Sequence, residues 1–198
     1  MLRMPSSWRL FWLLALGESA VVCLGLPRAN FHSPHGMEPI IVHSVRSALP
    51  FFLLAFTASS LFVLWPGTFT RWLLSNRRYF GLAFAFGMAW HLSFVGYSIL
   101  RFGNGLNRFV TTLDVIGLLF LLALTLTSFR WCSRHLSSPN WRRLHRSGVY
   151  AIWLLAIYIY ASAVRYQRDG VHLIFACLLL AAWLLRVMAG VKQRSAVS

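Results

Sequence analysis

Acidic residues are scarce in this sequence. Its 198 residues include only four Asp and Glu against 19 Lys and Arg, which gives a formal net charge of +15. Charged residues of both signs make up 12% of the chain, whereas a soluble domain carries roughly 25%. Hydrophobic residues make up 58%, and the mean hydropathy is +0.63. This composition argues against a water-soluble enzyme or binding domain and favours an integral membrane protein.

Cysteine pairs and nucleotide-binding glycine motifs are also missing. The three cysteines are far apart in the sequence and form no C-x-x-C pair, so a disulfide framework is not indicated. No G-x-G-x-x-G run follows an expected strand, which excludes a flavin or nicotinamide domain of that type within this chain. Alternation at period 2 is not sustained, which argues against a β-barrel.

The apolar residues fall in six blocks. Each block is long enough to cross a hydrocarbon core of about 30 Å as a helix at 1.5 Å per residue. We therefore predict an all-α membrane protein, a bundle of six transmembrane helices that forms a single domain over residues 1–198. The expected spans are Leu10–Leu26, Ala48–Trp65, Tyr79–Leu100, Phe109–Phe129, Ser147–Val164 and Val171–Gly190.

The basic residues lie between these blocks, where they suit anionic lipid headgroups better than nucleic acid. The positive-inside rule then predicts that both termini are cytoplasmic. A multi-pass protein of a cell membrane, the bacterial cytoplasmic membrane in particular, fits this pattern. One side holds thirteen cations and the other six: Arg3, Arg9, Arg71, Arg77, Arg78, Arg130, Arg134, Arg142, Arg143, Arg146, Arg186, Lys192 and Arg194 against Arg28, Arg46, Arg101, Arg108, Arg165 and Arg168.

Three polar residues within the spans are candidates for chemistry: Glu18, His91 and Asp114. Each should face another helix and find a polar partner, because an unpaired polar group in hydrocarbon is costly. His91 can be a helix-packing residue or an axial haem ligand, since imidazole suits iron. In the second case Gly87, one turn earlier, would leave space for a flat macrocycle.

The expected first outer loop, residues 27–46, contains histidines together with Met37 and Glu38. Such a set could hold a metal ion, although we favour a polar loop without one. His172, at the outer start of the sixth block, is interpreted as an interfacial residue that could also approach an outer haem. The loop histidines are His32, His35 and His43.

Two segments carry a family resemblance. Residues 76–84 (N-R-R-Y-F-G-L-A-F) followed by His91, and residues 127–131 (T-S-F-R-W) followed by 141–146 (W-R-R-L-H-R), resemble the ferric-reductase-like transmembrane domain. That superfamily includes the haem-binding membrane subunit of the methionine-sulfoxide reductase system. Over roughly residues 45–190, the resemblance implies a six-span bundle with b-type haem between the third and fifth spans.

The sequence departs from the family pattern at the fifth span. Where such proteins place a second histidine, this chain has Tyr158 and Ile159. His91 should also lie about 18 Å of helix rise above the inner face, whereas His145 sits among arginines at that face. We therefore expect His91 to use Tyr158, Tyr160 or an exogenous ligand. His145 is either a second haem contact or a residue that binds lipid phosphate or an acidic partner loop.

The resulting expectation is a membrane-embedded b-haem electron-transfer subunit of ferric-reductase-like type. Its candidate cofactor-binding residues are His91, His145 and Tyr158, with His91 as the ligand of the haem iron. Because no flavin or nicotinamide domain is evident, a separate donor and a separate acceptor would exchange the electrons, as in an oxidoreductase subunit. The alternative is a haem-free membrane scaffold or small permeation protein that keeps only the fold.

Overall fold

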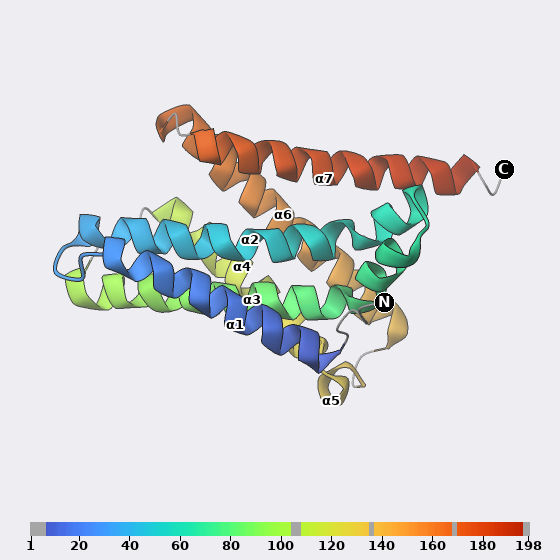
Figure 1. Ribbon diagram of the computed structural model, residues 1–198, viewed down its shortest axis with the longest axis horizontal. Helices are drawn as coiled ribbons and strands as arrows, with labels where there is room; N and C mark the ends of the chain where they lie inside the picture. Colours follow the sequence, from blue (N-terminus) through green and yellow to red (C-terminus); the bar gives the residue numbers. More distant parts are fainter. Residues whose placement is uncertain (1–6, 104–107, 135–136, 168–169, 196–198) are drawn as a thin grey trace. The chain divides into compact units, whose positions relative to one another are not determined.

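The computed structural model describes residues 7–103, 108–134, 137–167 and 170–195, and over these residues all of its regular structure is helical. The all-α prediction is therefore confirmed. Figure 1 shows the helices in chain order. They are α1 (Trp8–Gly25), α2 (Pro34–Leu64), α3 (Thr68–Phe102), α4 (Arg108–Thr127), α5 (Arg130–Ser133), α6 (Ser138–Gln167) and α7 (Gly170–Ser195), with a short 3-10 turn at Leu26–Arg28.

Every predicted span coincides largely with a helix. Within the described residues, five helices are long and apolar enough to cross a membrane: α1, α2, α3, α6 and α7. The sixth is α4, whose apolar part Leu113–Thr127 is shorter. A membrane bundle of five to six spans agrees with the prediction, while the cytoplasmic placement of both termini stays a prediction.

Helix α2 begins earlier in the sequence than predicted. Residues 27–46 were expected to form a long outer loop, but α2 starts at Pro34. The Ser33 hydroxyl accepts a hydrogen bond from the Gly36 amide at 3.1 Å, which is the contact of an N-cap residue. Pro34 then occupies the first helical position, where a missing N–H costs little. Pro50 consequently lies in the interior of α2.

Helix α3 also begins earlier than predicted. Residues 66–78 were expected to be an inner loop, whereas α3 starts at Thr68. The hydroxyl of Thr70 accepts a hydrogen bond from the Gly67 amide at 3.0 Å and donates one to the Trp65 carbonyl at 2.9 Å. These contacts close a tight connection between α2 and α3. Hydropathy located the apolar part of α3 and missed its polar first turns.

The chain divides into two compact units. Unit 1 comprises Met1–Ala55 and Ser75–Asn107, and unit 2 comprises Phe56–Leu74 and Arg108–Ser198. Two of the three boundaries fall inside helices, one within α2 and one within α3. The single domain expected over residues 1–198 stays a prediction.

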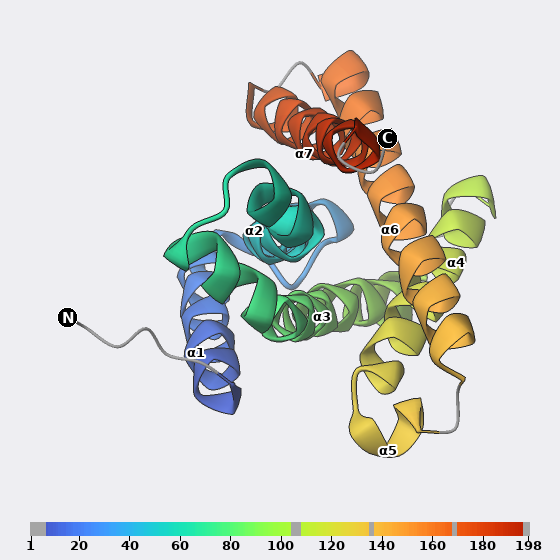
Figure 2. The ribbon, with the colours of Figure 1, turned by 90° about the vertical axis from the view of Figure 1, so that its right-hand side faces the viewer.

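Unit 1 consists of α1, the first part of α2 and most of α3, and Figures 1 and 2 show these segments running beside one another. Its apolar core includes Val22, Met37, Ile40 and Phe94, all buried. Asn76 accepts a hydrogen bond from the Ser7 amide at 3.2 Å. The first residue of the N-R-R-Y segment thus fixes the start of α1.

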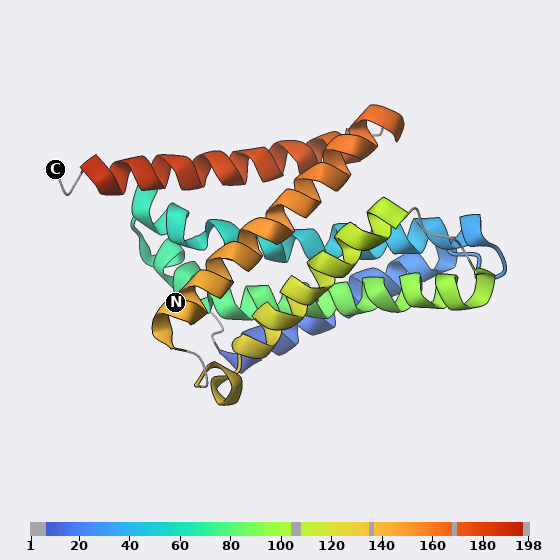
Figure 3. The ribbon, with the colours of Figure 1, turned by 180° about the vertical axis from the view of Figure 1, so that it is seen from behind.

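Unit 2 is built around α6, which packs against both α4 and α7. Figure 3 shows α4 and α6 side by side. The Trp153 indole N–H donates to the Leu179 carbonyl at 2.9 Å, and the Trp153 ring stacks on Trp183 at 6.2 Å between centroids. These contacts join α6 to α7 through both packing and a buried hydrogen bond.

Candidate functional site

His91 lies on α3 and is held by α2 within unit 1. Its Nδ1 atom is 3.0 Å from the Ile41 carbonyl oxygen and 3.4 Å from the Ser44 hydroxyl. The Ser44 hydroxyl also donates to the Ile41 carbonyl at 2.8 Å. One backbone carbonyl of α2 therefore organises both side chains.

The Ile41 contact determines the tautomer of His91. A carbonyl oxygen can only accept, so Nδ1 must carry the proton and donate it. In the neutral ring Nε2 is then the atom with a lone pair, and no described group hydrogen-bonds to it. A histidine that ligates a metal usually has this arrangement, with its other nitrogen donating to a carbonyl or carboxylate.

Gly87 does not provide the space that the haem interpretation assigned to it. A Cβ atom at this position would lie 2.6 Å from the Cβ atom of Ala48 and 2.8 Å from Oε1 of Glu18. Gly87 instead lets α3 approach both α2 and α1 closely. The expectation of room for a macrocycle at Gly87 is wrong, because neighbouring helices already fill that volume.

Glu18 has the polar partner that the sequence analysis required. Its side chain is 2% exposed, and its Oε1 atom accepts a hydrogen bond from the Ser47 hydroxyl at 2.7 Å. Ser47 and Ser44 are one turn apart on α2, and the Ser47 hydroxyl also lies 2.9 Å from the Ser44 carbonyl. A line of polar groups thus runs along α2 from the carboxyl of Glu18 to the imidazole of His91.

His145 is held inside unit 2 by the other motif segment. Its Nε2 atom lies 3.0 Å from the hydroxyl of Thr127, and that hydroxyl donates to the Ala123 carbonyl at 2.6 Å. The Trp141 indole N–H donates to the Thr127 carbonyl at 3.1 Å, and the Trp141 and His145 rings lie 4.2 Å apart. The T-S-F-R-W and W-R-R-L-H-R segments therefore meet at Thr127.

The two tyrosines of the fifth predicted span differ in burial. Tyr158 is 47% exposed, whereas Tyr160 is 4% exposed and packs against Phe175 and His172. His172 is itself 7% exposed, while its level at the membrane interface stays a prediction. The sequence placed this histidine at a helix start but could not show that α6 covers it.

The remaining candidates form no cluster. Among the described residues, no group of three or more His, Cys, Asp or Glu side chains could hold a metal ion. His35 contacts Glu38 at 3.0 Å, and His43 donates to the Val21 carbonyl at 2.8 Å. Asp114 is exposed and has no polar partner among the described side chains, so the partner expected for it is not found there.

The sequence is similar to known proteins over about half of its length. The chain is 37% identical over 120 residues to the "Protein-methionine-sulfoxide reductase heme-binding subunit MsrQ" of Yersinia pseudotuberculosis serotype O:1b (strain IP 31758), covering 54% of this chain and 57% of that protein. The subunit of the same name from Yersinia pestis (strain Pestoides F) is also 37% identical over 120 residues, covering 54% and 56%. This chain is similar to MsrQ.

The similarity to MsrQ confirms the predicted resemblance to the haem-binding membrane subunit of the methionine-sulfoxide reductase system. The aligned stretch spans little more than half the length of these MsrQ proteins. No protein-family model matches the chain, and neither does any solved structure. The similarity thus supports a related membrane haem subunit, while the ligand assignment depends on the geometry of this chain.

Proposed function

We propose that this chain is a haem-binding electron-transfer subunit of a membrane, with His91 as an axial ligand of the haem iron. The relatives named MsrQ are haem-binding subunits of a methionine-sulfoxide reductase, and five helices of this chain are suited to crossing a bilayer. The observation that carries the ligand assignment is the hydrogen bond from His91 Nδ1 to the Ile41 carbonyl at 3.0 Å.

The His91 environment fits a haem ligand chemically. The proton on Nδ1 leaves the lone pair on Nε2, which is the form that binds iron. A hydrogen bond from Nδ1 to a carbonyl also fixes the ring orientation and raises the basicity of the ligand. Bound haem would supply a one-electron redox centre of the b type. The chain itself orients the imidazole, keeps its Nδ1 atom hydrogen-bonded to the Ile41 carbonyl, and surrounds the ring with apolar helices.

His145 and Tyr158 remain candidates for contacts to haem, on the basis of the sequence resemblance. The Thr127 contact uses Nε2 of His145, so this residue would have to exchange that hydrogen bond for a bond to iron. We therefore rank His145 below His91. Tyr158 is more accessible within its unit than Tyr160, and a tyrosine ligand has a precedent in haem proteins.

The electron donor and acceptor are separate molecules in this proposal. A methionine-sulfoxide reductase subunit is the acceptor that the name of the relatives suggests. We further propose that both termini are cytoplasmic in a bacterial inner membrane, which would place the cation-rich ends of α6 and α7 on the donor side. The ferric-reductase-like type is part of the same proposal.

An absorption spectrum of the purified protein tests the proposal directly. Protein from haem-replete cells should show a Soret band that shifts on reduction, and a haem extraction assay should give the stoichiometry. Wild-type protein without a Soret band would refute the electron-transfer function and favour the haem-free scaffold or permeation protein. The departure from the family pattern at Tyr158 is the feature that supports this second candidate.

A further inference from the structure

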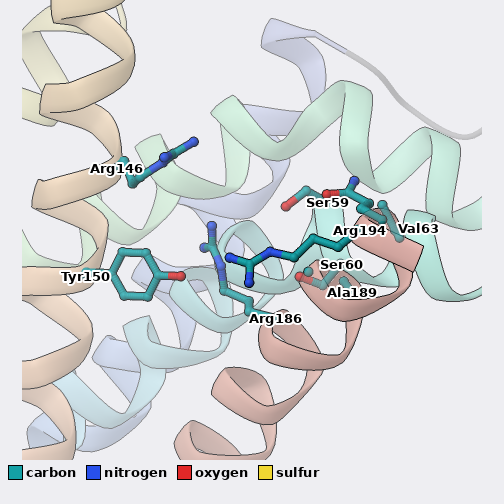
Figure 4. Close-up of a pocket in the computed structure, with 10 residues that line it drawn as sticks. Ser59, Ser60, Val63, Arg146, Tyr150, Arg186, Ala189 and Arg194 are labelled. Carbon is teal, nitrogen blue, oxygen red and sulfur yellow. The ribbon is translucent and has the colours of Figure 1, made fainter. Parts of the chain in front are cut away.

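Three arginines of unit 2 face one cavity that the proposed electron-transfer function does not use. The cavity has a volume of about 890 Å³ and is lined by residues of α2, α6 and α7, within the size range of ligand sites, roughly 300–1,000 Å³. In Figure 4, the side chains of Arg186 and Arg194 extend into the same space beside the ring of Tyr150. Its polar lining includes Arg146, Arg186, Arg194, Tyr150, Ser59 and Ser60.

No acidic side chain among the described residues pairs with Arg146 or Arg194. The whole sequence has four acidic residues, and no acidic side chain is among the described residues that line the cavity. Arg146 and Arg194 have no hydrogen-bond or ion-pair partner among the described residues. Arg146 and Arg194 are exposed, so water and salt screen part of the repulsion between the like charges in this cavity. An anion in the cavity would remove this cost.

Arg186 is held in place before any ligand arrives. Its Nη1 atom donates to the Phe56 carbonyl at 3.2 Å, and its guanidinium lies over the rings of Phe56 and Tyr150 at 4.4 and 4.9 Å from their centroids. A guanidinium fixed in this way loses little conformational freedom on binding. The planar group of Arg also matches the oxygen atoms of a phosphate, which it can bind through two parallel hydrogen bonds.

The cavity lies where apolar helices end in polar sequence. Ser59 to Val63 are near the end of α2, Arg146 and Tyr150 are in the first half of α6, and Arg186 to Arg194 are near the end of α7. Lys192 donates to the last carbonyls of α2, at 3.0 Å from Val63 and 3.2 Å from Leu64. Such a level corresponds to the membrane interface, where acidic lipid headgroups attract basic residues.

From these observations we propose that the cavity binds a phosphate group through Arg146, Arg186 and Arg194, and that an acidic phospholipid headgroup carries this phosphate. The hydroxyl groups of Ser59, Ser60 and Tyr150 line the same cavity and can donate to phosphate or glycerol oxygens. Free phosphate has the same chemistry without the lipid chains. The helix-end location favours the lipid as the source.

The test uses the full chain in neutral detergent, titrated with phosphatidylglycerol or phosphatidylcholine, with bound lipids counted by native mass spectrometry. The double variant R146Q/R194Q removes the two guanidiniums of the cavity that have no partner among the described residues and leaves Arg186 in its packed position. The matched control is R71Q/R143Q, because Arg71 and Arg143 are exposed residues of unit 2 that do not line the cavity. Both variants lower the net charge by two.

We expect wild-type protein to retain one phosphatidylglycerol in preference to phosphatidylcholine. R146Q/R194Q should weaken that binding by about tenfold or more, given the contribution of each basic residue near an anionic headgroup. R71Q/R143Q should bind like the wild type. Equal weakening in both double variants would overturn the proposal, because general surface charge would then account for the binding.

Two further results would also overturn it. If inorganic phosphate at millimolar concentration displaces the lipid and binds as tightly, the site is one for soluble phosphate and the lipid assignment fails. If R146Q/R194Q loses haem together with lipid while R71Q/R143Q keeps both, the cavity takes the carboxylates of haem. The lipid measurement can be made on haem-free protein, so it stands or fails separately from the electron-transfer function.

Discussion

The imidazole of His145 donates from Nε2 to the hydroxyl of Thr127 at 3.0 Å, whereas the imidazole of His91 donates from Nδ1. The Thr127 hydroxyl is committed as a donor to the Ala123 carbonyl, so it must accept from His145. At His91 the hydrogen bond to Ile41 uses Nδ1. The two histidines of the family resemblance therefore differ in which nitrogen is already engaged.

This difference predicts unequal effects of removing the two histidines. His91→Ala should abolish the reduced-minus-oxidised haem spectrum, because it removes the imidazole whose Nε2 has no described partner. His145→Ala should retain most of the haem and lower stability instead, since it removes the hydrogen bond from α6 to Thr127 of α4. Haem content per protein and a thermal unfolding midpoint measured on the same preparations separate the two effects.

His145→Gln provides a control for the second variant, because its amide can replace the donor to Thr127. It should recover part of the stability lost in His145→Ala. A normal spectrum in His91→Ala would show that haem is bound elsewhere. Loss of haem in His145→Ala at unchanged stability would make His145 the ligand and reverse our ranking.

Ser47 should matter for stability because it satisfies a buried carboxyl group. Ser47→Ala would leave the Glu18 carboxyl, 2% exposed, without the hydroxyl now at 2.7 Å. An unsatisfied buried acceptor costs about 1–3 kcal/mol, so the thermal midpoint in detergent should fall. Ser93→Ala is the matched control, since Ser93 is exposed and its hydroxyl bonds only to the Ala89 carbonyl of its own helix. Equal midpoints for the two variants would contradict the role given to Ser47.

The sequence predicted the helices well and their ends poorly. Apolar blocks locate only the part of a helix that suits hydrocarbon, so they missed the polar first turns of α2 and α3. A Ser followed by a Pro is a typical helix start, so Ser33 and Pro34 could have predicted where α2 begins. The contact of His145 with Thr127 could not be predicted from the sequence. The two residues are 18 positions apart, and their contact depends on how α4 and α6 pack.

The polar residues within spans show the same limit. Burial cost predicts that a carboxyl inside a span needs a partner, and this holds for Glu18. It does not identify which neighbour supplies the partner, and none is found for Asp114 among the described side chains. Gly87 was a recognisable small residue, but whether a cofactor or another helix fills the space beside it depends on packing alone.

Gly87 is expected to tolerate no side chain. The Cβ atom of Gly87→Ala would lie 2.6 Å from the Ala48 Cβ atom, and overpacking of this kind costs typically about 1–3 kcal/mol. Gly96→Ala on the same helix meets nothing within 4 Å and should be neutral or slightly stabilising, because Ala favours the helix. Unfolding midpoints of both variants test this, and a Gly87→Ala protein as stable as the wild type would show that α3 can move away from α2.

Membrane topology can be tested with reporter fusions. Fusions after Ala196 and near Ser138 should report a cytoplasmic location, and one near Asn104 should report the opposite side, because the positive-inside rule places thirteen cations against six. Paired alkaline-phosphatase and fluorescent-protein fusions at each position provide internal controls. A cytoplasmic signal near Asn104 would be incompatible with six spans and two cytoplasmic termini.

The two tyrosines of α6 should respond differently to removal of their hydroxyl groups. If Tyr158 contacts the iron, Tyr158→Phe should shift the Soret band and the reduction potential while haem content stays near normal, because His91 would still hold the haem and axial ligands tune its electronics. Tyr160→Phe should leave the spectrum unchanged and alter stability, since Tyr160 is 4% exposed and packs against His172. Spectra and potentiometric titrations of both variants decide between them. A spectral shift confined to Tyr160→Phe would move the contact to the buried Tyr160–His172 pair, and unchanged spectra in both would favour an exogenous ligand opposite His91.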